Sequence, residues 1–226
     1  SNNLSITQKG ITITAAVKTK VYGEVDPELT YTITTGSIEN GDVLSGSLSR
    51  VAGENVRDYA ISSTLSNDNY DISFVSNNLS ITQKEITITA AAKTKVYGEA
   101  DPELTYTITA GSLENGDVFT GGLSRVTGEN VGDYIISSTL SNDNYNITFV
   151  SNNLSITQRV VIISADAKTK IVGEADPELT YAITQGNLVT TDNFSGNLTR
   201  ELGETIGVYV IQQGNVSLGL NYAITF

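Results

Sequence analysis

The sequence predicts an all-β protein made of three tandem small β-sandwich-like domains that form an elongated rod. Short segments alternate apolar and hydroxyl residues, turn residues separate these segments, and the whole pattern recurs with a fixed period. The octapeptide Ser-Asn-Asn-Leu-Ser-Ile-Thr-Gln begins at Ser1, Ser76 and Ser151, so the period is 75 residues (76 − 1 and 151 − 76). A fixed period of this kind indicates one folded unit used three times.

The second copy shows the strand pattern most clearly. Its alternating segments are rich in β-branched and aromatic residues. They are Ile86–Ala90, Leu104–Thr109, Tyr134–Ser137, Tyr145–Phe149 and Leu154–Thr157, with a weaker candidate at 119–126. In 104–109 we expect Leu, Tyr and Ile to point inward. Tight turns such as Asn115-Gly116-Asp117 lie between the strands, because Asn and Gly accept positive φ angles. An all-β unit with this strand spacing suggests a small immunoglobulin-like sandwich.

Each octapeptide runs into the first strand of the next copy without a Gly/Ser-rich or Pro-rich linker, so we expect little swivel between units. Two domain frames fit. In the first, residues 1–8 are the closing strand of a preceding repeat, the repeats are 9–83, 84–158 and 159–226, and the third lacks its final strand. In the second, complete units span 1–75, 76–150 and 151–226.

The first frame leaves a spare strand at residues 1–8 and a gap in the third repeat. The spare strand of one molecule would then complete the third repeat of another, which gives a head-to-tail chain by strand exchange. The second frame needs no exchange. In both frames the partners expected first are neighbouring repeats of the same chain.

Composition excludes several classes of function. The formal net charge of −12 argues against binding nucleic acid. No apolar run approaches the ~20 residues of a membrane-spanning helix, so we expect no membrane insertion. The chain has no Cys and no His, and no nucleophile–base pair or phosphate loop is recognisable. We therefore expect no enzyme, no catalytic residues and no cofactor.

One acidic cluster is a weak candidate for a metal site. Glu99, Asp101 and Glu103 alternate beside a turn, and oxygen-rich loops of this kind can hold Ca²⁺. The spacing matches no known calcium-loop pattern, and a solvated acidic face explains it equally simply. The sequence therefore favours no metal, with Ca²⁺ as the alternative.

Two other residue types recur in every copy. Lys18 and Lys20, with their counterparts, could form a cross-link to Asn or Asp only if they were buried and deprotonated, and their charged surroundings favour solvated Lys. Tyr31, Tyr59 and Tyr70 could form a platform for sugars, but their strand phase favours core rings. The Tyr of Gly132-Asp133-Tyr134 occupies a position where sandwiches often fix a corner through the hydroxyl group.

The motifs resemble those of a known family. They are Lys95-Val96-Tyr97-Gly98-Glu99, Asp101-Pro102-Glu103-Leu104-Thr105-Tyr106, Gly128-Glu129, Gly132-Asp133-Tyr134 and Asn144-Tyr145-Asn146-Ile147-Thr148-Phe149. Their order resembles the MBG domain of the YGX type, a tandem module of large bacterial surface proteins and adhesins. The third copy departs at Val172-Gly173 and at Gly207-Val208-Tyr209. The resemblance implies an extracellular protein, secreted or attached to the cell surface.

Two functions fit the sequence. The favoured one is a structural stalk of a bacterial adhesin, which projects a distal domain and serves cell adhesion. The alternative is that each repeat binds a mucin-like glycoprotein or polysaccharide weakly, with affinity multiplied by repetition. The outward strand positions are mostly Thr and Ser, a bland face that favours the stalk.

Overall fold

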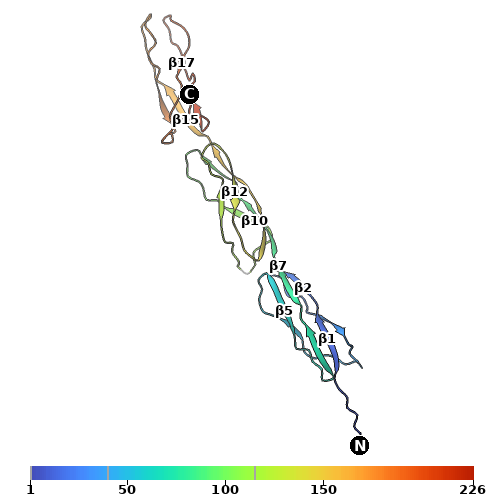
Figure 1. Ribbon diagram of the computed structural model, residues 1–226. Helices are drawn as coiled ribbons and strands as arrows, with labels where there is room; N and C mark the ends of the chain where they lie inside the picture. Colours follow the sequence, from blue (N-terminus) through green and yellow to red (C-terminus); the bar gives the residue numbers. More distant parts are fainter. Residues whose placement is uncertain (1, 40, 115) are drawn as a thin grey trace. The chain divides into compact units, whose positions relative to one another are not determined.

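The computed structural model describes residues 2–39, 41–114 and 116–226 (Figure 1). Within these ranges the regular structure is all β, with no helix, and the strand pattern recurs in three tandem repeats, which confirms the predicted fold class. No helix of the described part of the chain has the length and apolar character that crossing a membrane requires.

The first repeat contains two sheets. Its strands are β1 (Lys9–Ala15), β2 (Lys18–Val21), β3 (Tyr31–Thr35), β4 (Leu48–Arg50), β5 (Arg57–Ser63), β6 (Tyr70–Val75) and β7 (Asn78–Thr82). One sheet has the order β3-β1-β6, with β1 antiparallel to β3 and parallel to β6. The other has the order β2-β7-β5-β4, with β7 parallel to β2 and antiparallel to β5. The octapeptide strand β7 is therefore a central strand of the second sheet.

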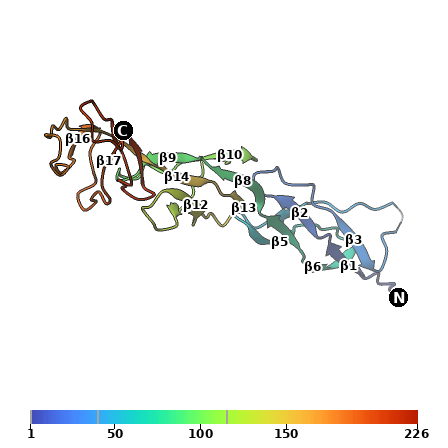
Figure 2. The ribbon, with the colours of Figure 1, turned by 90° about the horizontal axis from the view of Figure 1, so that it is seen from above.

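The second repeat has the same plan. Its strands are β8 (Lys84–Ala90), β9 (Lys93–Val96), β10 (Tyr106–Ala110), β11 (Leu123–Arg125), β12 (Gly132–Ser138), β13 (Tyr145–Val150) and β14 (Asn153–Thr157). The sheets have the orders β10-β8-β13 and β11-β12-β14-β9. The second octapeptide strand, β14, lies between β9 and β12 (Figure 2).

The third repeat keeps the first sheet and loses most of the second. Its strands are β15 (Arg159–Ala165), β16 (Tyr181–Gln185), β17 (Thr199–Arg200), β18 (Ile211–Gln212) and β19 (Tyr222–Thr225). The first sheet has the order β16-β15-β19, with the same parallel and antiparallel pairings as in the first repeat. Its second sheet consists of β17 and β18 alone among the described residues.

Alternation along the first strand of each repeat builds the core. Ile11, Ile13 and Ala15 of β1 are 2%, 0% and 1% exposed, while the residues between them lie nearer the surface. β8 repeats the pattern. Full burial of one Ile side chain stabilises a domain by roughly 1.5–3 kcal/mol. The apolar residues of these strands therefore hold the two sheets together.

One expected strand lies at the edge of its sheet. β10 begins at Tyr106 rather than at 104, and both Tyr106 and Ile108 are partly solvent exposed, at 38% and 36%. In the equivalent strands Ile33 lies opposite the buried Ile13, and Tyr181 packs against the core of the third repeat. These positions therefore lie on the predicted inward face, and the strand's place at the sheet edge leaves them partly exposed.

Contacts divide the chain into two compact units. One comprises Ser1–Ile88, Ile108–Gly122 and Thr139–Phe149, and the other Thr89–Thr107, Leu123–Ser138 and Val150–Phe226. The division passes through the second repeat, so the junction between the first two repeats lies inside the first unit. The junction between the last two repeats lies inside the second unit. The elongated rod stays a prediction.

Candidate functional site

The junction between the first two repeats is built on a nearly continuous strand. A single residue, Gln83, separates β7 from β8. The Gln83 side-chain amide donates hydrogen bonds to the carbonyl groups of Asp143 and Tyr145 at 3.1 and 3.2 Å. The Lys84 amide donates to the Asn144 carbonyl at 3.0 Å. The Gln83 side chain and the Lys84 amide therefore both fix the short connection to residues 143–145, at the start of β13.

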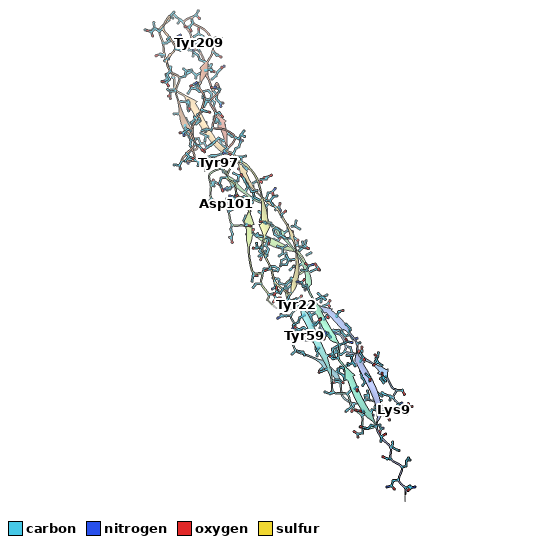
Figure 3. The ribbon with its side chains drawn as sticks, viewed as in Figure 1. Lys9, Tyr22, Tyr59, Tyr97, Asp101 and Tyr209 are labelled. Atoms are coloured by element: carbon cyan, nitrogen blue, oxygen red, sulfur yellow. The ribbon has the colours of Figure 1, made fainter. Side chains whose placement is uncertain are left out.

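Tyr22 lies directly after β2 in the first repeat, and its ring packs against core residues of the second repeat (Figure 3). Its ring is 5% exposed and packs edge-on against Tyr145, with ring centroids 5.6 Å apart. Both rings belong to a cluster with Tyr59 and Ile81 of the first repeat and Ile86 of the second. The two repeats therefore share one apolar core at their junction, and such edge-to-face ring pairs contribute beyond their buried area.

One carboxylate fixes this ring pair. The Tyr22 and Tyr145 hydroxyls both donate hydrogen bonds to Asp117 Oδ2, each at 2.8 Å. Burial, opposed by the hydrogen bond with the Glu114 amide and reinforced by Asp117, raises the pKa of Tyr145 to about 12. The Tyr145 hydroxyl therefore stays protonated and available as a donor at physiological pH.

A second polar contact crosses the same junction. The Val56 amide donates to Asn144 Oδ1 at 3.0 Å, and Asn144 Nδ2 donates to Asn55 Oδ1 at 3.2 Å. The loop between β4 and β5 is thereby tied to the turn before β13. Because one Asn side chain serves as both acceptor and donor, it fixes rotation at the junction as well as separation.

The junction between the second and third repeats uses the same chemistry. Tyr97 packs edge-on against Tyr222, with centroids 5.4 Å apart, and Tyr222 donates to Asp192 Oδ2 at 2.7 Å. The Val131 amide donates to Asn221 Oδ1 at 2.9 Å. A hydrogen bond with Asp192 is the largest cause that raises the pKa of Tyr97. Two junctions with matching residues indicate a joint specified by the repeat itself.

The acidic candidates of the second repeat lie in an ion-pair network. The Lys95 ammonium donates to Asp101 Oδ1 at 2.6 Å, to Glu129 Oε2 at 2.5 Å and to the Glu99 carbonyl at 3.0 Å. Arg125 Nε and Nη2 donate to the two Asp101 oxygens at 2.6 and 3.0 Å. Two protein cations therefore already occupy the Asp101 carboxylate, whose place in the second repeat is labelled in Figure 3.

The structure does not gather the three acidic candidates. Glu99 Oε2 accepts from the Val96 amide at 3.2 Å, and Glu103 is exposed. In the part of the chain that the structure describes, no group of three acidic side chains is arranged to hold a metal ion. The calcium alternative stays a prediction for experiment.

The same four-residue network occurs in every repeat. Its members are Lys20, Asp26, Arg50 and Glu54 in the first repeat, and Lys170, Asp176, Arg200 and Glu204 in the third. The spacing within each set is identical. The network joins the turn that holds Asp26, Asp101 or Asp176 to the loop after β4, β11 or β17, so it holds those two loops of each repeat together.

The expectation that these Lys side chains are solvated is wrong for Lys20 and Lys95, which are both 6% exposed. Burial lowers the pKa of Lys95, but the hydrogen bonds and charges of Asp101 and Glu129 outweigh burial, so the pKa is raised. The same balance raises the pKa of Lys20. A charged ammonium is no nucleophile, and these groups are therefore not poised for a cross-link.

The Tyr residues divide into three roles. Tyr59 and Tyr70 are buried, as predicted, whereas Tyr31 is 36% exposed. The predicted corner is confirmed, because the Tyr134 hydroxyl donates to the Asn130 carbonyl at 2.7 Å. Tyr59 and Tyr209 make the equivalent bonds.

Tyr22 and Tyr97 are junction residues that pattern reasoning missed, and their recurrence within the motif Val-Tyr-Gly-Glu was the available signal.

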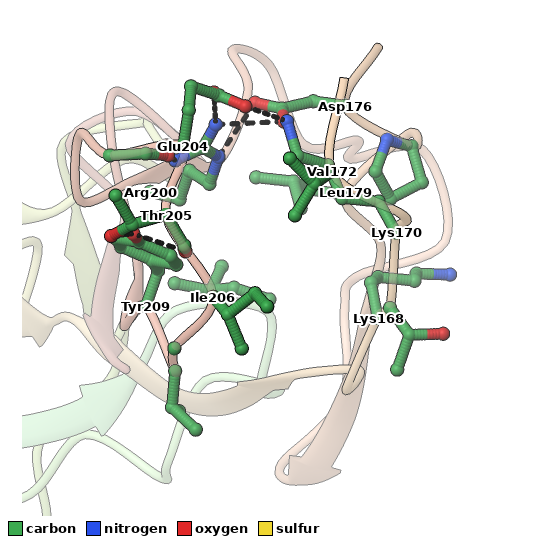
Figure 4. Close-up of a pocket in the computed structure, with 16 residues that line it drawn as sticks. Lys168, Lys170, Val172, Asp176, Leu179, Arg200, Glu204, Thr205, Ile206 and Tyr209 are labelled. Carbon is green, nitrogen blue, oxygen red and sulfur yellow. Dashed lines mark hydrogen bonds and ion pairs between the residues drawn. The ribbon is translucent and has the colours of Figure 1, made fainter. Parts of the chain in front are cut away.

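The third repeat has an open groove where the other repeats hold a central strand. Segments 168–172 and 203–211, the counterparts of the segments around β14, line a cavity of about 350 Å³, with Tyr209 and Lys168 on opposite sides (Figure 4). A second cavity of about 350 Å³ lies between 163–167 and Phe226, and Tyr209 and Ile211 line both cavities.

Comparison with known proteins identifies the family. The family model described as MBG domain (YGX type) matches residues 11–80, 86–155 and 161–226, which is most of the chain. A comparison with curated proteins gives no match. The chain therefore belongs to the MBG domain family of the YGX type, with three domains in tandem.

Proposed function

We propose that these repeats are stalk segments of a secreted or cell-surface bacterial adhesin, and that they hold a distal domain away from the cell. Tandem MBG domains suggest a repeat of a surface protein. The roles as adhesin and as stalk are what we propose in addition. The observation that carries the proposal is the shared junction core, in which Tyr22 of one repeat is buried with Ile86 and Tyr145 of the next.

A stalk needs joints that resist bending. A one-residue connection, a shared ring pair and an Asn that bonds across the joint all restrict relative motion of two repeats. The same contacts recur at the second junction, so each added repeat brings its own joint. Repetition of one joint is suited to adding length. We propose no catalytic role for the repeats.

A length series tests the proposal. A further copy of residues 84–158 inserted after Gln158 keeps the repeat phase, and small-angle X-ray scattering at low concentration then compares the longest dimension of the two proteins. A stalk predicts an increase of about one sheet length, on the order of 30 Å or more. A longest dimension that does not grow would contradict the stalk.

Weak binding of sugars by each repeat is the second candidate. Tyr31 and Tyr106 occupy equivalent positions and expose 36% and 38% of their surface, so both rings are accessible for stacking. A glycan array probed with the chain and with the double variant Tyr31→Ala/Tyr106→Ala tests this. Binding that the double variant abolishes favours the binding module, and equal signals from both proteins count against it.

A further inference from the structure

The first and last strands of the first repeat lie side by side and run in the same direction. β1 and β2 together span 9–21, and β6 and β7 together span 70–82. β1 is parallel to β6 and β2 is parallel to β7. In both pairings each residue lies opposite the residue 61 positions further along the chain (70 − 9 and 79 − 18). The two segments therefore form one parallel pair in constant register, which we call the terminal pair.

Hydrogen bonds outside the strands extend the terminal pair at both ends and bridge its middle. The Lys9 amide donates to the carbonyl group of the residue before β6 at 2.9 Å. At the other end, the Tyr22 amide donates to the Thr82 carbonyl at 2.9 Å. Where the pair passes from one sheet to the other, Asn77 Nδ2 donates to the Ala15 carbonyl at 2.8 Å. The two segments are therefore hydrogen-bonded along their whole length.

The core of the repeat covers one side of the terminal pair. Ile13 in its first half and Leu79 in its second half are both 0% exposed. Lys20 of β2 is also buried, and its ammonium is ion-paired with Asp26 and Glu54. Hydrogen bonds beside a low-dielectric core are electrostatically stronger than bonds surrounded by water. The burial of these side chains therefore strengthens the bonds between the two segments.

The order of the strands decides how tension along the chain acts on the terminal pair. The chain enters the repeat at the start of 9–21 and leaves it at the end of 70–82. Because the two segments are parallel, tension pulls them in opposite directions along their own length. All hydrogen bonds between them are then loaded together, in shear. A hairpin of antiparallel strands pulled at its open end would instead open one bond at a time.

The second repeat has the same strand order and is connected on both sides within the chain. β9 and β14 are parallel, and residues again lie opposite partners 61 positions further along (154 − 93). Gln83 alone separates β7 from β8, and Gln158 alone separates β14 from β15. Tension therefore passes from one repeat to the next through single residues and loads each terminal pair in the same way.

We propose that the terminal pair is a shear clamp, which lets the first and second repeats bear tension along the chain without unfolding. This property goes beyond a stalk, because a stalk needs length and resistance to bending, whereas the clamp resists stretching. A repeat should stay folded until its two segments slide apart, and it should then unfold in one step. Release of residues 9–82 adds on the order of 250 Å of extended chain.

Pulling one repeat in two directions tests the clamp. The chain has no Cys, so pairs of introduced Cys residues fix where the DNA handles of an optical trap attach. Gln8→Cys with Gln83→Cys loads the terminal pair of the first repeat in shear. Gln8→Cys with Asp68→Cys pulls at one end of the pair and peels it open. All three positions are exposed, so folding of the whole chain is preserved.

The shear geometry should need at least about twice the unfolding force of the peeling geometry at the same pulling speed, since its bonds must break together. Equal forces in the two geometries would overturn the proposal. Failure of the clamp would leave the length series above unaffected, because scattering measures length in the absence of tension. The two proposals can therefore fail separately.

Two variants separate the clamp from general stability. Asn77→Ala removes the side-chain bond to the Ala15 carbonyl within the terminal pair. Ser49→Ala removes the side-chain bond of 2.9 Å to Ser62 between the antiparallel strands β4 and β5. At constant force in the shear geometry, Asn77→Ala should unfold about threefold to tenfold faster than the parent, and Ser49→Ala at the parent rate. The same unfolding rate in both variants would also overturn the proposal.

Discussion

The Tyr22 hydroxyl of the first repeat donates a hydrogen bond to the Asp117 carboxylate of the second over 2.8 Å. Tyr145, within the second repeat, donates to the same oxygen over the same distance. Asp117 therefore belongs both to its own domain and to the joint. Folding of the second repeat therefore positions the Asp117 carboxylate, which accepts the hydrogen bond from Tyr22 of the first repeat.

Removal of the Tyr22 ring should loosen this joint. Tyr22→Ala deletes a buried ring and should cost about 3–5 kcal/mol of unfolding free energy. Tyr22→Phe removes only the hydroxyl group and should cost about 0.5–1.5 kcal/mol. Denaturant unfolding followed by Tyr fluorescence measures both. Tyr31→Ala, at an exposed ring, is the matched control, and an equal loss in that variant would contradict the junction role.

The buried Lys should matter more than its exposed counterpart. Lys95→Met leaves Glu129 and Asp101 with Arg125 as their remaining cation and should cost about 1–3 kcal/mol. Lys170→Met makes the same change where the ammonium is 22% rather than 3% exposed, so a smaller loss is expected. Thermal melting of the two variants compares them. Equal destabilisation would show that burial of Lys95 adds nothing.

Acid should destabilise the ion-pair networks. Hydrogen bonds from Arg50 and Arg125, aided by Lys20 and Lys95 and opposed by burial, lower the pKa of Asp26 and Asp101 from 3.8 to about 2. Between these values the unfolded chain binds more protons than the folded chain, so stability falls as pH falls from about 4 to 2. Above this range the contribution is fully present.

Melting midpoints measured from pH 6 to pH 2 test this pH dependence. The Asp101→Asn variant lacks one titrating carboxyl group, so its midpoint should fall less steeply over the acid range. An identical slope in parent and variant would remove Asp101 as a source of the acid sensitivity.

The glycine after the junction Tyr should resist substitution. Gly98 has φ +81°, and an added Cβ would lie 2.2 Å from Val189 Cγ2 of the third repeat. Gly173 has φ +91°, with no atom within 4 Å of its added Cβ. Both Ala variants incur left-handed strain of about 1–2 kcal/mol. Only Gly98→Ala adds a steric clash at a joint, so its melting midpoint should fall further than that of Gly173→Ala.

Removal of calcium should leave stability unchanged. Asp101 is already paired with Lys95 and Arg125, and Glu103 lies apart from that network at an exposed position. Thermal melts with Ca²⁺ and with a chelator should therefore coincide. A rise in the melting midpoint on addition of Ca²⁺ would assign a metal to these repeats.

Local alternation predicted the buried strands well. Ile86–Ala90 and Tyr145–Phe149 lie within β8 and β13, because one covered face needs apolar residues at every second position. β9 was not predicted, since Lys-Thr-Lys-Val reads as a charged turn. Its inward Lys95 is compensated by carboxylates 6 and 34 residues away, and no local pattern carries that information.

The junction was predictable in outline only. The absence of a linker indicated a short joint, and a single residue connects β7 to β8. The role of Tyr22 was not predictable, because its partner Asp117 lies 95 residues away in another repeat. The recurrence of this Tyr at 97 marked it as part of the repeat, but recurrence alone does not separate a core residue from a junction residue.

Restriction of motion at the first junction is tested most directly by the distance between spin labels on Ser73→Cys and Thr148→Cys. These exposed, equivalent positions lie in the first and second repeats, and the chain contains no other Cys. Pulsed electron paramagnetic resonance should give one narrow distance distribution, which broadens when Tyr22→Ala is added. A broad distribution that Tyr22→Ala leaves unchanged would contradict a packed junction.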